Sequence, residues 1–189
     1  MTSAKLYLGF LLLLGAERLV ELSLSRRNAR LAFAEGAIEV GQGHYRVMTV
    51  LHTAFLLACG FEVVAVPRAF PGMLGWLALA GALAAQALRY WAISTLGVRW
   101  NTRIIVRPEL APVTSGPYRL VRHPNYVAVG LELVAVPLIH GAYWTALCFT
   151  LANALLLRVR IRMEERALGE HYVTAFADLP RFVPGLKRG

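Results

Sequence analysis

Charged residues are scarce in this chain, and acidic residues are the scarcest. Only 16% of the 189 residues are charged, with 11 Asp and Glu against 20 Lys and Arg, whereas a soluble domain carries about 25%. Hydrophobic residues make up 57%, and the mean hydropathy is +0.53. This excess excludes a disordered chain and argues against a soluble globular one. With a net charge of +9, it favours a small integral membrane protein with basic cytoplasmic loops.

Cysteine and glycine patterns exclude further kinds of site. Cys59 and Cys148 both lie in apolar stretches, so we expect small buried hydrophobes, with no disulfide framework and no metal site. The pattern Gly41-Gln42-Gly43 has no third glycine and follows no predicted strand, so we expect no Rossmann domain. A nucleic-acid-binding protein shares the positive charge but does not normally carry such long apolar runs. We therefore expect no nucleic-acid partner.

Long apolar runs predict an all-α, polytopic bundle of five transmembrane helices. A helix needs about 20 apolar residues to cross a hydrocarbon core of about 30 Å. The first three spans are predicted at 4–24, 47–66 and 72–96. A signal peptide is the rival interpretation of the first run. We discount it because Glu17, Arg18 and Glu21 follow where small cleavage-site residues are expected.

The next apolar stretch, 126–157, is interrupted at His140-Gly141, which predicts two helices joined by a tight turn. The first, over 126–139, is short, because roughly 14 residues at 1.5 Å each give about 21 Å. The second is predicted over 142–168 and leaves the membrane near Arg158 as a charged helix. The alternative is four spans with a re-entrant hairpin.

Basic residues are distributed unevenly along the chain. Segments 25–46, 97–125 and 158–189 hold 16 of the 20 Lys and Arg residues, and only Lys5 and Arg68 fall on the side predicted to be opposite. The positive-inside rule places the three segments in the cytoplasm, with the N-terminus outside and the C-terminus inside. We therefore expect a protein of the inner cell membrane.

Two polar segments can carry chemistry. In 97–126, Gly116-Pro117 is a turn signal and Pro124 opens a helix. The residues Arg119, Arg122, His123, Asn125 and Tyr126 then cluster at a helix N-terminus, where free N–H groups suit an anion or a carboxylate. In the second segment, from 158, helical spacing pairs Arg160 with Glu164 and Arg162 with Glu165. The plainer interpretation is a solvated helix whose arginines contact lipid phosphates.

Three motifs follow one another in the second half of the chain. They are Gly116-Pro117-Tyr118-Arg119, then Arg122-His123-Pro124-Asn125-Tyr126 before the helical hairpin, then Arg160-x-Arg162-x-Glu164-Glu165. Gly169-Glu170-His171-Tyr172 and Pro180…Pro184 continue the pattern. Over about residues 90–186 the chain resembles the isoprenylcysteine carboxyl methyltransferase (ICMT) family of integral membrane methyltransferases.

The resemblance implies S-adenosylmethionine as cofactor, bound at the cytoplasmic face. By analogy, the cofactor pocket is lined by His123, Pro124, Tyr126 and Glu165, and we add Tyr118, Glu164 and Tyr172 from the matching motifs. Arg122 and Arg162, with His123, are the expected catalytic residues. One integral membrane domain is then predicted over 1–189, with the substrate side in 1–96 and the methyltransferase core in 97–189.

Methyl transfer agrees with the chemistry of these residues. A carboxylate such as Glu164 or Glu165 attracts the sulfonium of the donor, and paired arginines hold an anionic oxygen by bidentate contacts. A carboxylate acceptor is ionised at pH 7 and needs no base. A phenol needs a base, for which His123 is the first candidate; a structural histidine at a helix start is the alternative.

The residues predicted to bind the methyl acceptor are Trp100, Asn101, Glu132 and Arg119. Glu132 lies inside a span, where it lines the acceptor head group or pairs with Arg89 or Arg18. Trp100 stacks on a flat ring or anchors the third span at the interface.

Further motifs refine the resemblance. Ser25-Arg26-Arg27-Asn28, Gly36-Ala37-x-Glu39, His44-Tyr45 and Trp100-Asn101-Thr102-Arg103 are similar to a bacterial branch associated with type III polyketide synthases. That resemblance implies O-methylation of a phenol or enol in a lipophilic acceptor such as an alkylpyrone or alkylresorcinol. The alternatives are methylation of a prenylcysteine-like carboxylate or of a thiol, and a non-enzymatic lipid-binding scaffold. Expected partners are the lipophilic substrate and membrane lipids.

Overall fold

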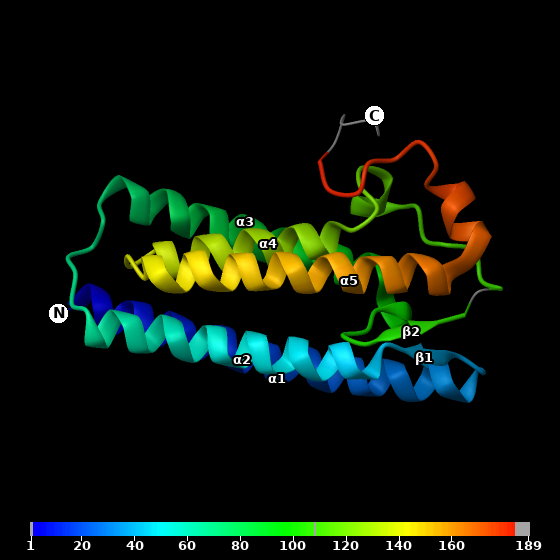
Figure 1. The fold of residues 1–189 in the computed structure, drawn as a ribbon, viewed down its shortest axis with the longest axis horizontal. Coiled ribbons are helices and arrows are strands. Elements are labelled where there is room, and N and C mark those ends of the chain that lie inside the picture. The colour runs from blue at the N-terminus through cyan, green and yellow to red at the C-terminus, as the bar shows by residue number, and fades with distance from the viewer. Residues whose placement is uncertain (1, 108, 184–189) are drawn as a thin grey trace.

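The computed structural model describes residues 2–107 and 109–183 and is built from five helices that run alongside one another (Figure 1). They are α1 (Thr2–Ala34), α2 (Gln42–Ala65), α3 (Met73–Leu96), α4 (Pro124–Leu138) and α5 (Tyr143–Ala175). Short 3-10 helices η1 (Gly97–Arg99) and η2 (Gly116–Arg119) lie between α3 and α4. The predicted helical bundle is thus confirmed. Three residues named in the sequence-based predictions lie outside the described residues: Lys187 and Arg188, counted among the cytoplasmic charges, and Pro184 of the matching C-terminal motif.

Two corrections concern the first loop. Residues 25–34, predicted as loop, continue α1 to Ala34, because neither glycine nor proline interrupts them before Gly36. The all-α class also omits a small antiparallel sheet. Strands β1 (Ile38–Val40) and β2 (Ile104–Val106) pair Ile38 with Val106 and Val40 with Ile104. The described residues form no other sheet, and this one is not the parallel sheet of a Rossmann domain.

Helices α1 and α2 form one layer, and α3, α4 and α5 lie over it (Figure 1). Packing between α3 and α4 is the most extensive, because α3 presents the small residues Ala78, Ala82 and Ala85. A side chain at Gly75 would approach the Ile139 carbonyl oxygen to 2.9 Å. Small residues allow the backbones of membrane helices to come this close.

The main apolar core occupies the end of the bundle that holds the α2–α3 and α4–α5 connections. It contains Tyr7 and Leu11 of α1, Phe55 and Cys59 of α2, and Leu133 of α4. A smaller cluster joins Ala92, Tyr118, Tyr172 and Phe176 at the opposite end. This second cluster fixes α3, η2 and the end of α5 against one another.

The basic segments gather at the end that holds β1 and β2, while the N-terminus and the 66–72 connection lie at the other end (Figure 1). Among the described residues, α2 and α5 are long and apolar enough to cross a membrane, and α4 is a shorter apolar helix. Large apolar side chains also cover the outside of the other helices, including Leu12 of α1 and Trp76 and Leu83 of α3. The fold is therefore that of a membrane helix bundle.

Candidate active site

A cavity of about 370 Å³ lies between the two helix layers at the end that carries the basic segments. Its wall includes residues of all five helices, of β2 and of the 97–113 segment. The volume is at the lower end of the roughly 300–1,000 Å³ that small-molecule sites occupy. At one end of the wall are His123 and Tyr126, and the wall continues between the helices to Arg89 and Glu132.

The start of α4 builds one side of this cavity. Pro124 is the first helical residue and is fully buried, so its role is packing. The backbone N–H groups of Arg122 and His123 donate to the carbonyls of Pro180 and Arg181, at 3.0 and 3.2 Å. The end of the described chain thereby lies directly against the histidine turn.

His123 is buried and connects the turn to α5. Its Nε2 donates to Glu165 Oε1 at 3.1 Å, and the same carboxylate accepts from Arg181. Burial opposes ionisation of Glu165, but the bonds from His123 and Arg181 outweigh it and lower its pKa to about 2. The His123 ring also stacks with Tyr126, 5.3 Å between centroids. Glu165 thus stays ionised and holds the imidazole in place.

Glu164 belongs to a separate set of hydrogen-bonded residues. It accepts a hydrogen bond from the Tyr126 hydroxyl, which in turn accepts from Arg160 Nε at 2.9 Å. Arg160 Nη2 donates to the Thr102 carbonyl at 2.6 Å and so ties α5 to the 97–113 segment. All four residues are part of the cavity wall. The predicted pairs are therefore wrong in detail, because Arg160 contacts Tyr126 and Glu165 contacts His123 and Arg181.

Arg122 is buried in the wall and binds backbone. Its Nε donates to Leu179 O at 2.6 Å and Nη2 donates to Ala177 O at 3.3 Å. Tyr118 and Tyr172 are buried in the same wall. Burial, with the nearby charge of Glu164, raises the pKa of both phenols above the ordinary value. Both therefore remain protonated at neutral pH.

Four of the predicted site residues are not part of the cavity wall: Pro124 and Glu165 lie beside it, and two others lie elsewhere. Arg162 and Arg119 are exposed, and neither belongs to the cavity wall described here. The helical repeat explains Arg162: at about 100° per residue it faces roughly 200° away from Arg160. Glu164, four residues after Arg160, shares the Arg160 side. From the sequence, Arg160 is predicted only to pair with Glu164; its position on the same side of α5 as Glu164 is the signal that would have assigned it to the site.

The 97–102 segment brings two of the predicted acceptor residues into the wall. Trp100 is buried, and its carbonyl accepts a hydrogen bond from Asn28 Nδ2 at 2.8 Å. Asn101 accepts from Ser25 Oγ at 2.7 Å and donates to the Ser25 carbonyl at 3.0 Å. Both side-chain partners come from the part of α1 that was predicted as loop.

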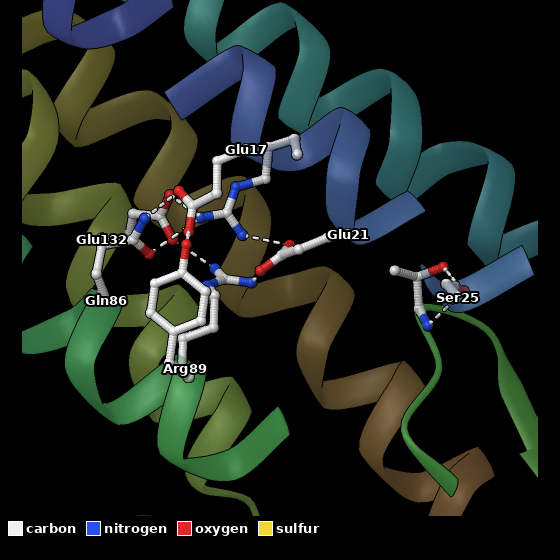
Figure 2. A network of polar contacts seen from close by, with 9 residues as sticks. Glu17, Glu21, Ser25, Gln86, Arg89 and Glu132 are labelled. Atoms are coloured by element: carbon white, nitrogen blue, oxygen red, sulfur yellow. Dashed lines mark hydrogen bonds and ion pairs between the residues drawn. The ribbon is translucent and has the colours of Figure 1, made fainter. Parts of the chain in front are cut away.

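The deeper part of the wall carries a charged network, shown in Figure 2. Glu132 is paired with Arg89 and, at 3.3 Å, with Arg18. Arg18 also contacts Glu21 at 2.6 Å. The predicted ion pair of Glu132 with Arg89 or Arg18 is confirmed, with both arginines taking part. Three helices, α1, α3 and α4, are connected by this network.

The wall provides groups that fit S-adenosylmethionine. Glu164 supplies a carboxylate for a sulfonium, and Tyr126 and Tyr172 supply aromatic faces. Five buried polar atoms of wall residues have no hydrogen-bond partner among the described residues. Three belong to the charged network (Arg18 Nε, Glu21 Oε1 and Arg89 Nε), and the other two are Trp100 Nε1 and Asn125 Oδ1. A ligand with hydroxyl and amino groups satisfies such atoms. Among those residues, no group of three or more His, Cys, Asp or Glu is placed to hold a metal ion.

Comparison with known proteins gives bacterial relatives. Protein YpbQ of Bacillus subtilis (strain 168), described as uncharacterized, is 40% identical over 158 residues, which cover 83% of this chain and 93% of YpbQ. An uncharacterized protein of Haemophilus influenzae (strain ATCC 51907 / DSM 11121 / KW20 / Rd) is 32% identical over 154 residues, covering 81% and 89%.

A solved structure shares the fold. It is that of the eukaryotic intramembrane Ras methyltransferase ICMT, at 22% identity and a TM-score of 0.58. The match covers 77% of this chain but 54% of that protein, so this chain spans about half of its length. Residues 76–170, which include the histidine turn and both glutamates, match the family model itself. The chain therefore belongs to the isoprenylcysteine carboxyl methyltransferase (ICMT) family.

Proposed function

We propose that this protein transfers the methyl group of S-adenosylmethionine to an oxygen atom of a lipophilic acceptor within the membrane. One observation carries the proposal: a single cavity joins the Glu164–Tyr126–Arg160 group and His123 to a space between apolar helices. An acceptor with a long hydrocarbon chain lies between the helices, and its polar head meets the cofactor. Family membership supports a membrane methyltransferase.

The cofactor contacts fall to residues at the histidine-turn end of the cavity. When bound, S-adenosylmethionine supplies a methyl group on a positively charged sulfur. Glu164 favours that charge because it is the wall carboxylate beside Tyr126, whereas Glu21 and Glu132 are paired with arginines. Glu165 acts one step away, by fixing His123 and Arg181. Tyr118 and Tyr172 remain protonated and serve as hydrogen-bond donors.

We assign to Arg160 the anion-holding role expected of Arg162. Arg160 is 4% exposed, and its Nε and Nη2 are bound to Tyr126 and Thr102. Its Nη1 makes no hydrogen bond to any residue in the described ranges and is available to an oxygen anion. Arg122 holds the chain near residues 177–179 against the turn, so its contribution is to position the site.

For the acceptor we favour a phenol or enol of an alkylpyrone or alkylresorcinol type, and assign the chain to the bacterial branch associated with type III polyketide synthases. The relatives from Bacillus and Haemophilus are matched over most of their length, whereas the eukaryotic enzyme is matched over about half. A phenol must lose its proton, and His123 is the candidate base. With Nε2 donating to Glu165, Nδ1 of the neutral ring carries the lone pair that can accept that proton.

A lipophilic carboxylate is the second candidate, because the description of the matching family names carboxyl methylation. Such an acceptor is already ionised at neutral pH and needs no base. The two candidates therefore differ in their demand on His123.

The proposed location is the inner membrane, with five spans, the N-terminus outside and the cavity opening toward the cytoplasm. The clustering of the basic segments at the cavity end supports this orientation. We keep the division into a substrate side, 1–96, and a methyltransferase core, 97–189, as part of the proposal.

The test uses detergent-purified protein with S-adenosylmethionine labelled in its methyl group. Acceptors are pentadecylresorcinol, an alkylpyrone and N-acetyl-S-farnesylcysteine. We expect label in an ether of the first two. Label only in a methyl ester would favour the carboxylate. Absence of any calorimetric heat with S-adenosylmethionine or its demethylated product would contradict the enzyme itself.

A further inference from the structure

His52 lies in the cavity wall on α2, outside the histidine turn. It is ten residues into α2, about 15 Å along the helix. Met48, Thr49, Thr53 and Leu56 of the same helix also line the cavity, so one face of α2 forms this part of the wall. No residue here belongs to the motifs that mark the family match.

The ring of His52 has a defined hydrogen-bond role. Its Nδ1 lies 2.9 Å from the Met48 carbonyl oxygen. A carbonyl only accepts, so Nδ1 carries the hydrogen and Nε2 of the neutral ring has a lone pair. Within the described ranges, Nε2 makes no hydrogen bond. The wall therefore offers a hydrogen-bond acceptor atom on this face of α2.

The charged groups near His52 come from three other helices. They are Arg18 of α1, Arg89 of α3 and Glu132 of α4. Arg89 and Arg18 are both bound to Glu132, and each also lies near Glu21. These ions are paired with one another, and Arg18 Nε, Arg89 Nε and Glu21 Oε1 are left without a hydrogen-bond partner among the described residues. A ligand that reaches this depth meets the His52 lone pair without having to break an existing bond of that ring.

We propose that His52 accepts a hydrogen bond from a hydroxyl group of the methyl acceptor and thereby selects acceptors that carry an O–H group in this part of the cavity. The proposal rests on the proposed function and narrows it to polyhydroxylated lipophilic rings. An ether or a hydrocarbon at the same place has no hydrogen to donate and leaves Nε2 unpaired. Such an unpaired group lowers affinity because its desolvation is not compensated.

The test compares two substitutions, each of which keeps the hydrogen-bonding function of only one of the two ring nitrogens. His52→Asn keeps an amide near the Nδ1 position, which can donate to Met48, but has no atom in place of Nε2. His52→Gln extends an amide to the Nε2 position, where its oxygen can accept. Binding of pentadecylresorcinol and of its dimethyl ether is measured by calorimetry at about pH 8, where an imidazole of ordinary pKa is neutral.

We expect the wild-type protein to bind the resorcinol about tenfold more tightly than the ether, as one hydrogen bond allows. His52→Asn should abolish this preference and His52→Gln should restore most of it. A preference retained in His52→Asn, or absent in the wild type, would overturn the inference. Binding of S-adenosylmethionine is measured separately in all three proteins. Its absence in the wild type would contradict the proposed function, whereas the probe preference reports on His52 alone.

Discussion

Glu164 and Glu165 are adjacent in sequence but act in separate groups. Glu164 accepts from Tyr126 in the cavity wall, whereas Glu165 is bound to His123 and Arg181 beside it. Successive helical residues differ by about 100°, so a pair of neighbouring carboxylates reaches two partners that face different directions. The two acids of the motif therefore divide into one that belongs to the cavity wall and one that holds the histidine.

The anion-holding role can be tested with a matched pair of arginines. Arg160→Gln should lower turnover at least tenfold, because a charged hydrogen bond to the acceptor oxygen is lost. Arg162→Gln should leave it within about twofold, since Arg162 is exposed. Initial rates are compared at saturating S-adenosylmethionine, with thermal unfolding as the check on folding. Equal losses in both variants would remove the distinction between the two positions.

Glu165 gives the site a pH-dependent contribution to stability. Its pKa in the folded protein is about 2, against an ordinary 4.5. Because the folded value is the lower one, the stabilisation is fully present above about pH 4.5 and is lost as the pH falls toward about 2. The difference in Tm between wild type and Glu165→Gln should therefore be constant near neutral pH and shrink below about pH 4.5. A difference unchanged at pH 3 would disprove the contribution.

At the scale of elements, the packing of α3 on α4 depends on small side chains. Ala82 is 1% exposed, whereas its neighbour Leu83 is 57% exposed. Ala82→Leu should destabilise the protein by about 1–3 kcal/mol, because extra methylenes force the two helices apart. Leu83→Ala changes volume on the outer surface and serves as the control. Unfolding in a denaturing detergent measures both, and an unaffected Ala82→Leu variant would argue against close packing.

The helix boundaries that sequence predicted best are those marked by proline or glycine. For the α2–α3 turn and the starts of α4 and α5, the predicted boundaries differ from the observed ones by no more than two or three residues. The predicted end of the last helix, at 168, coincides with the kink of α5 at Gly169. The end of α1 was missed because Arg26, Arg27 and Arg30 form helices well and were used only as a charge signal. Strand β1 was missed because it has only three residues and is held by pairing with β2, which is distant in the sequence: Ile38 pairs with Val106.

The candidate site was predictable where a short motif fixes it. His123, Tyr126 and Glu164 were identified from sequence and meet in one wall. To predict Arg160, one has to know which way each side chain points around α5. To predict His52, one has to know how α2 packs against the other helix layer. Contacts of that kind depend on how helices are placed, which spacing along one helix does not determine.

At the scale of the whole molecule, the ends of the bundle differ in charge, and this predicts an orientation. In a protein whose Cys59 and Cys148 are replaced by alanine, we introduce one cysteine at Lys5 or at Arg27, both exposed. An impermeant maleimide added to inside-out vesicles should label Arg27→Cys and not Lys5→Cys. Intact spheroplasts should give the reverse result. Labelling of both from one side would contradict the orientation.

The intrinsic fluorescence of one wall residue, Trp100, can report whether the cavity is occupied. The chain has four tryptophans; Trp76, Trp91 and Trp144 are exposed on the outside of the bundle, whereas Trp100 is buried, with its indole N–H unpaired in the described structure. The emission of an indole shifts when that group gains a partner. Filling and emptying of the cavity can therefore be followed as a small spectral change on a constant background from the other three, without attaching a dye.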